Sequence, residues 1–139
     1  MSANPTQAFQ DIKTKLTAIS NIDIIDTHDD VTLTNGVVKP YVVLTFGGPI
    51  RVQADRGIVE SKRDTTLYWV IIECVSNDLG VARKLKVDVI SQLEDYVPNN
   101  NGRVVVDGGF SDTITKTSAI PKRFVEATRM SFHHNLNWA

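Results

Sequence analysis

The sequence predicts an α+β domain in which two helices pack on a mostly antiparallel sheet. Three observations support this fold class. A helical apolar spacing lies near the N-terminus, a second one follows an unbroken apolar run in the middle of the chain, and strand-like stretches lie between and after them. The 139 residues suit a single domain spanning 1–139, without internal repeats or low-complexity tails.

The composition is that of an ordinary globular domain. Apolar residues make up 42% and charged residues 22%, and the net charge is -1, so bulk charge does not indicate nucleic-acid binding. The single cysteine, Cys74, lies in an apolar run and is expected to be a small core residue. No apolar signal core or membrane-length apolar window is found, so we expect synthesis in the cytoplasm and no membrane partner.

The first half of the chain predicts a helix followed by strands. Asn4 can cap a helix that starts at Pro5 and runs to about residue 19, with apolar residues at helical spacing. The segment "IDIID" alternates like a short strand, and a longer strand is expected from Tyr41, because Pro40 suits the beginning of a strand. Residues 47–64, rich in glycine and charge, are expected to form a long hairpin connection.

The second half begins with the clearest strand. The run "TTLYWVIIECV" is apolar throughout, which favours a central strand with both faces covered. A helix is expected over about 79–96, with its apolar stripe formed by Ala82, Leu85, Val89, Leu93 and Tyr96.

Two further strands are expected near the C-terminus. "RVVVDGGF" predicts a strand with a bulge or tight bend at its two glycines, followed by a polar connection over residues 111–122. The last segment, from Arg123 to Trp138, is expected to be a terminal strand with one half-buried face.

The stretch "SNDLGVAR" after the central strand could begin a phosphate-binding loop. Such a loop needs several glycines, whose amides converge on the anion, and usually a lysine. Here one glycine is present, and no Gly-Lys-Ser/Thr follows. We therefore interpret Asn77 or Asp78 as the N-cap of a helix, worth about 1 kcal/mol, and expect no nucleotide site.

Other patterns that could support chemistry are weak. In "DTHDD", an extended chain would place Asp26, His28 and Asp30 on one side as metal ligands, but a solvated acidic loop is the favoured interpretation. His133 and His134 are adjacent on a predicted strand, so they face opposite ways. No Gly-x-Ser-x-Gly motif is present. We expect no metal, no cofactor and no enzymatic activity.

The order of the elements resembles the tail terminator proteins of long-tailed, siphovirus-type bacteriophages. The resemblance rests on the leading helix "FQDIKTKLTAI", the strand "PYVVL", and the apolar strand that ends in a small polar turn before "ARKLKVDVISQL". It covers roughly residues 5–135. Its motifs are patterns of residue type and include no catalytic signature.

The resemblance implies a ring-forming α+β subunit. In this family, a homohexameric ring caps the tail tube, stops its polymerisation and joins the tail to the head connector. The implied partners are other copies of the chain, the major tail tube protein and a head–tail connector or neck protein. DNA would pass through the lumen without being read in sequence. The implied location is the head-proximal end of the virion tail, and the host cytoplasm during assembly.

Two sets of residues are candidates for contacts in such a ring. Arg51, Arg56, Lys62 and Arg63 lie in the segment that matches the long hairpin and are candidate tube or lumen contacts. Phe132, His134 and Trp138, near the C-terminus, are candidate subunit contacts, although Trp138 could equally dock on its own core.

Two rival functions stay open at this point. One is another phage neck or tail-completion protein, which would share the composition and the tendency to assemble. The other is a small α+β ligand-binding domain or enzyme, which would show a deep apolar pocket with converging polar groups.

Overall fold

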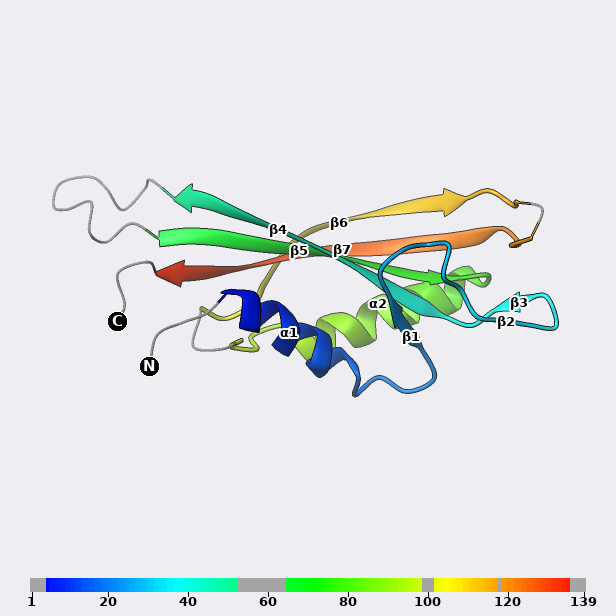
Figure 1. Ribbon diagram of the computed structural model, residues 1–139, viewed down its shortest axis with the longest axis horizontal. Helices are drawn as coiled ribbons and strands as arrows, with labels where there is room; N and C mark the ends of the chain where they lie inside the picture. The colour runs from blue at the N-terminus through cyan, green and yellow to red at the C-terminus, as the bar shows by residue number, and fades with distance from the viewer. Residues whose placement is uncertain (1–4, 53–64, 99–101, 118, 136–139) are drawn as a thin grey trace, which may run out of the picture.

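The computed structural model describes residues 5–52, 65–98, 102–117 and 119–135. Two helices lie on one face of a long, twisted sheet (Figure 1). The elements in chain order are α1 (Pro5–Leu16), β1 (Asp23–Ile25), β2 (Leu33–Thr34), β3 (Val37–Val38), β4 (Tyr41–Val52), β5 (Thr65–Ser76), α2 (Leu79–Leu93), β6 (Val105–Ile114) and β7 (Arg123–Asn135). The predicted α+β class is confirmed.

The main sheet has five strands in the order β1-β4-β5-β7-β6. Its three long pairings, β4 with β5, β5 with β7 and β7 with β6, are antiparallel, and only the short β1–β4 pairing is parallel. The apolar strand β5 is the central strand, as its sequence predicts. Strands β2 and β3 form a separate hairpin. Its turn, Asn35-Gly36, has positive φ at both residues (53° and 78°), as a two-residue type I′ hairpin turn requires.

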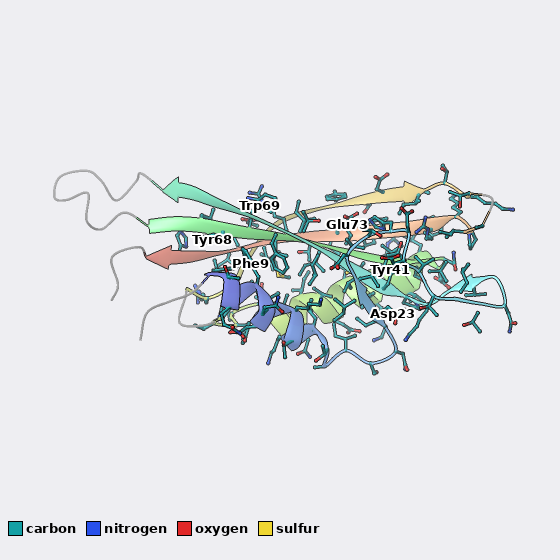
Figure 2. The ribbon with its side chains drawn as sticks, viewed as in Figure 1. Phe9, Asp23, Tyr41, Tyr68, Trp69 and Glu73 are labelled. Atoms are coloured by element: carbon teal, nitrogen blue, oxygen red, sulfur yellow. The ribbon has the colours of Figure 1, made fainter. Side chains whose placement is uncertain are left out.

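The helix face of the sheet carries the larger core. The apolar residues of α1 and α2 pack against alternate residues of β4, β5 and β7, which face the helices because side chains alternate along a strand. Phe9 of α1 stacks on Phe46 at 4.4 Å between ring centroids and contacts Tyr68 edge-on (Figure 2). The buried members are Ala8, Ile12, Leu16, Val42, Val70, Ile72, Cys74, Leu85, Val89, Leu93, Val104, Met130 and Phe132.

Among the described residues, the opposite face of the sheet is covered only at one end. Residues 26–40, which we call the strap, pack with Ile114 and Ile120 on a second, smaller cluster. The buried members of this cluster are Val38, Tyr41, Val43, Val75, Val125 and Ala127. We call this side the strap face. The sequence predicts that β5 is covered on both faces, but on this face Trp69, Ile71 and Glu73 are only half-buried. The strap reaches Glu73 through the side chain of His28, and Ile71 packs against the smaller cluster.

Both helices are shorter than the sequence predicts. Helix α1 ends at Leu16, not near residue 19, because Thr17, Ala18 and Ile19 each bond three residues back and Asn21 then takes positive φ (62°). Helix α2 ends at Leu93, since the chain turns at Asp95 (φ 66°). Tyr96 therefore lies beyond the helix, whereas the rest of the predicted stripe is buried as expected.

Two expectations for the C-terminal strands are wrong. Strand β6 continues to Ile114 through the polar residues that we assigned to a connection. Strand β7 has no half-open face over most of its length. It lies between β5 and β6, and nearly all of its side chains from Arg123 to Phe132 are buried. The polarity of residues along this strand does not reveal which of them are buried. Glu126 and Thr128 are polar but buried, with hydrogen-bond partners in helix α2 and β6.

The bulge predicted at the paired glycines of β6 is confirmed: the register with β7 shifts between Val106 and Gly108. Within the described residues, neither helix has the length and apolar character needed to cross a membrane.

Candidate subunit-interaction surface

The two edges of the main sheet differ in how they are protected. At one edge, β1 pairs with Tyr41–Val43, and further along β4 the register shifts between Gly47 and Ile50, where Pro49 lies. A short covering strand, a bulge and a proline are devices that discourage pairing with another chain. The edge formed by β4 is therefore partly protected, and its stretch from Leu44 to Gly47 has no outer partner among the described residues.

The other edge, β6, is open in the described part of the chain, where no further strand pairs with it. Eight of its ten residues are exposed and the other two are half-buried. After the bulge, Gly108–Ile114 pairs with β7 over seven consecutive residues in regular register. This stretch contains neither proline nor lysine, the residues that most often blunt an edge strand. Phe110 (46%) and Val105 (45%) add exposed apolar surface on the strap face.

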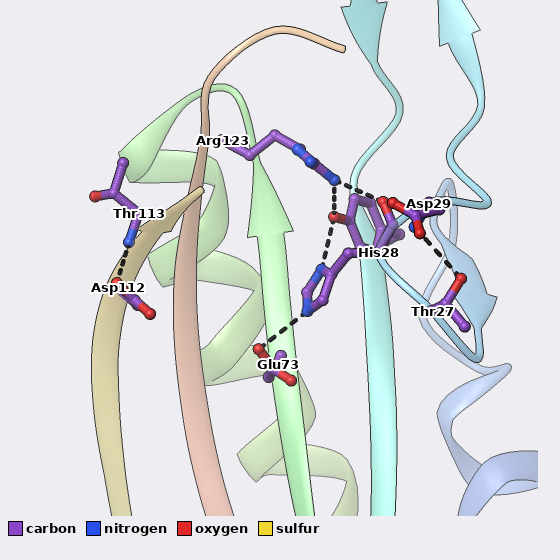
Figure 3. A network of polar contacts seen from close by, with 8 residues as sticks. Thr27, His28, Asp29, Glu73, Asp112, Thr113 and Arg123 are labelled. Carbon is purple, nitrogen blue, oxygen red and sulfur yellow. Dashed lines mark hydrogen bonds and ion pairs between the residues drawn. The ribbon is translucent and has the colours of Figure 1, made fainter. Parts of the chain in front are cut away.

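The backbone of this edge directs hydrogen-bonding groups away from β7. The N–H of Thr113 donates to the carboxylate of Asp112 at 2.7 Å, which indicates that it points away from β7 (Figure 3). In an antiparallel edge strand, alternate residues direct both N–H and C=O outward, so Ser111 and Gly109 share this direction. A row of outward polar groups is a template for a further strand.

The open part of the strap face continues from β6 across the sheet. The indole of Trp69 lies against Gly47, and the guanidinium of Arg129 lies 5.9 Å from its ring centroid. Arg129 also pairs with Asp107 at 3.6 Å. Figure 2 shows Trp69 on the side of the sheet away from Phe9. Among the described residues, nothing covers this part of the sheet.

A polar network holds the strap on the sheet (Figure 3). Nδ1 of His28 lies 2.9 Å from the hydroxyl of Tyr41, and Nε2 lies 3.1 Å from Oε2 of Glu73. Arg123 donates from Nη1 to the same hydroxyl and to the backbone carbonyl of His28, both at 2.7 Å. With a neutral His28 protonated on Nε2, each bond has one donor and one acceptor: Arg123 to Tyr41, Tyr41 to His28, and His28 to Glu73.

This network brings four titratable side chains together: His28, Tyr41, Glu73 and Arg123. Tyr41 has no exposed surface, and burial raises the pKa of its hydroxyl, although the guanidinium of Arg123 opposes the shift. A hydroxyl that is buried and already bonded to two neighbours has no access to a substrate. Nε of Arg123 is buried without a hydrogen-bond partner. An unsatisfied buried donor lowers the stability of the fold at this position. The network fixes the strap.

A second polar group joins helix α2 to the edge strand on the helix face. The hydroxyl of Ser111 donates to Oε2 of Glu126, and Nε of Arg83 donates to Oε1 at 3.3 Å. The bond from Ser111 and then that from Arg83 lower the pKa of Glu126, against the opposing effect of burial. This pair of bonds ties the open strand β6 to the body of the subunit.

Three sequence-based candidates for chemistry can now be placed. Asp78 caps α2, and its Oδ1 accepts from the N–H of Gly80 at 2.8 Å. His28 of the "DTHDD" segment turns into the strap network instead of toward Asp26 and Asp30, and the described residues contain no group of three or more metal-ligating side chains. Burial raises the pKa of the Cys74 thiol to about 12, so it stays protonated near neutral pH.

The structure describes only some of the residues that the sequence analysis named as candidate tube, lumen or subunit contacts. Phe132 is 1% exposed and stacks on Tyr68 in the core of its own subunit, so its side chain has no surface to offer to another copy. Arg51 lies in β4 opposite Thr66, and the backbone of His134 in β7 pairs with the same residue. Arg56, Lys62, Arg63 and Trp138 lie outside the described residues.

Sequence reasoning missed the strap network and the open edge. The network joins residues separated by up to 95 positions, and no local pattern links them. The only available signal was the presence of single charged residues, Glu73 and Arg123, inside or next to apolar strands. The open edge was missed because β6 was expected to end at Phe110, within its regular stretch from Gly108 to Ile114.

Comparisons with known proteins add one structural similarity. No family model and no curated protein matches this chain. Among solved structures, it is similar to a chain from the virion of a native gene transfer agent particle. The two share 15% sequence identity with a TM-score of 0.49, and the match covers 94% of this chain and 95% of that chain. At this identity and TM-score, the similarity concerns the course of the chain and assigns no function.

Proposed function

We propose that this protein is a structural virion protein that ends a phage tail. In this role it forms a homohexameric ring on the head-proximal end of the tail tube, stops polymerisation of the tube and joins the tail to the head connector. The role needs surface complementarity and no catalytic group. The observation that carries the proposal is the open edge β6, together with the order of elements that resembles tail terminators.

The open edge supports an assembling protein over a soluble enzyme. A monomeric protein rarely leaves seven regular edge residues without proline, lysine or a cover. One hollow among the described residues, with a volume of about 310 Å³, is a shallow one beside Lys15 and Tyr96. It is open to solvent and is not the deep apolar pocket that a small-molecule site uses. The polar network under the strap is partly buried, and its side chains bond to one another across the strap and the two strands that it crosses.

One face of a terminator ring must bind the end of the tube, and its opposite face must not bind a further ring of tube protein. A tail tube is a stack in which every ring offers the next the same heterologous surface, so its growth has no intrinsic stop. We propose that the charged hairpin segment, with Arg51, Arg56, Lys62 and Arg63, faces the tube or the lumen. Charges at such a face set register and association rate more than affinity.

The proposal is tested by removing the gene from the phage that encodes it. Virion preparations should then contain tails of abnormal and variable length and heads without tails. Supplying the wild-type protein should restore a single tail length, and supplying a variant with charge reversal at Arg56, Lys62 and Arg63 should not. Tails of normal length in the deletion would exclude the terminator role and favour a neck or tail-completion protein.

A further inference from the structure

We propose that the open edge β6 of one copy pairs with the outer edge of β4 in the next copy, so that the main sheet continues from subunit to subunit. The inference rests on the proposed ring. A closed ring of identical subunits needs a heterologous contact, in which two different surfaces of each copy meet. The two edges of the sheet are two such surfaces on opposite sides of one subunit.

The strand directions fit this contact. From β4 through β5 and β7 to β6, each pairing is antiparallel, so β6 runs opposite to β4. When a second copy continues the sheet in the same sense, its β4 therefore meets β6 in an antiparallel pair. This is the pattern of every long pairing within the subunit.

The available backbone also fits. β6 presents outward N–H and C=O groups at Gly109, Ser111 and Thr113, as its alternation requires. On the other side, β4 is covered by β1 only over Tyr41–Val43, and the next four residues, up to Gly47, have no outer partner among the described residues. The bulge after Gly47 limits the pairing at its far end.

The charges along the two edges do not oppose each other. β6 carries two acidic residues, Asp107 and Asp112, and no basic residue. β4 carries one basic residue, Arg51, and no acidic residue. Like charges placed directly opposite one another destabilise a pair of strands, and none would be so placed here.

The exposed apolar residues explain why the contact would hold. Phe110 lies on the strap face at the open edge, with 46% of its surface exposed. On the same face, Thr45 is the exposed residue of β4 in its uncovered stretch. A continued sheet would cover part of Phe110 with the β4 strand of the neighbour and remove an exposed aromatic ring from water.

The test measures amide hydrogen exchange in the assembled protein, resolved to single residues by mass spectrometry. In the assembly, the outward amides of Gly109, Ser111 and Thr113 should exchange at least about tenfold more slowly than in the dilute, dissociated protein. Amides in the 44–47 stretch of β4 should slow in parallel. Slowing in β6 alone would indicate a symmetric β6–β6 contact and would overturn the inference.

Two single proline substitutions provide a test variant and its matched control. Thr113→Pro removes one outward N–H, which an edge strand tolerates because the bond to β7 is not involved. Thr115→Pro places the same residue just beyond the end of β6, at another exposed threonine. We expect Thr113→Pro to keep its thermal midpoint and lose assembly, and Thr115→Pro to keep both.

The outcomes separate this inference from the proposed function. An assembly that caps tail tubes while its β6 amides exchange as fast as in the dissociated protein would overturn edge pairing and leave the terminator role standing. An assembly with paired edges that has no effect on tail tubes would support the inference and contradict the terminator role. A protein that stays monomeric under all conditions, including in the presence of tail tubes, would overturn both.

Discussion

Nε2 of His28 lies 3.1 Å from Oε2 of Glu73, a residue 45 positions later in the chain and on the central strand of the sheet. The other ring nitrogen of His28 meets the hydroxyl of Tyr41 at 2.9 Å. This one side chain therefore joins the strap to the two strands that it crosses (Figure 3). The smaller core of the strap face depends on the strap staying in place.

The first prediction concerns this bridge. His28→Ala should lower the free energy of unfolding by about 1–3 kcal/mol, because the buried hydroxyl of Tyr41 and the carboxylate of Glu73 each lose a partner. Asp26→Ala, at an exposed position of the same segment, should change it by less than about 0.5 kcal/mol. Urea unfolding of both variants measures the difference, and equal effects would show that the network contributes nothing to holding the strap.

The second prediction tests the phase of helix α2. Leu85 is 4% exposed and packs in the larger core, so Leu85→Ala should cost about 2–5 kcal/mol through lost burial and the cavity left behind. Lys84 is exposed and pairs with Asp88 at 3.1 Å, so Lys84→Ala should cost less than about 0.5 kcal/mol. Chemical denaturation that ranks the two variants in the opposite order would contradict the observed packing.

The third prediction concerns the close approach of β4 and β5 near the bulge. A Cβ added at Gly47 would lie 2.0 Å from the indole of Trp69, so the ring would have to move. Gly47→Ala should therefore destabilise the protein by about 1–3 kcal/mol. Gly108→Ala is the matched control, because its added Cβ would meet its nearest neighbour, Arg129, at an ordinary 3.9 Å. Thermal unfolding that leaves Gly47→Ala as stable as Gly108→Ala would disprove this steric argument.

The fourth prediction follows from the lowered pKa of Glu126, caused first by the bond from Ser111 and then by that from Arg83. A carboxyl group whose pKa is lower in the folded state stabilises the fold above its unfolded pKa. That contribution is lost as the pH falls through the folded value. Glu126→Gln should therefore be less stable than the wild type at pH 7, and the difference should shrink below about pH 4.5.

The control for this titration is Glu94→Gln, at an exposed position after α2. At pH 7, this variant should match the stability of the wild type within about 0.5 kcal/mol, because the side chain is exposed. A gap between Glu126→Gln and the wild type that stays constant from pH 7 to about pH 3 would show that the ionised carboxylate is not the stabilising form.

Local sequence patterns predicted where helices and strands form more accurately than they predicted which side chains those elements bury. The apolar spacing of α2 and the unbroken run of β5 each identified an element and its buried side, because these signals reflect burial directly. For β7, the sequence predicted a strand with one half-buried face, whereas its polar residues Glu126 and Thr128 are buried in the structure. They are buried because partners from α2 and β6 satisfy them. Such partners come from distant parts of the chain, and one sequence does not reveal them.

The candidate interaction surface was the least predictable feature. Whether a strand lies at an edge depends on strand order, which only the assembled sheet defines. Phe132 illustrates the consequence: its aromatic ring suggested a subunit contact, whereas the neighbouring Tyr68 and Phe9 enclose it. Phe110, a ring of the same type on β6, is the exposed one.

The most direct test of the proposed function is the length of tail tubes that polymerise in the presence of this protein. Tube protein from the same phage would be assembled with and without the purified chain, and the tubes measured by electron microscopy. We predict that the added protein stops growth, binds at one end of each tube and narrows the length distribution as its concentration rises. Tubes that grow to the same lengths with the protein present, and that carry no density at either end, would contradict the proposed function.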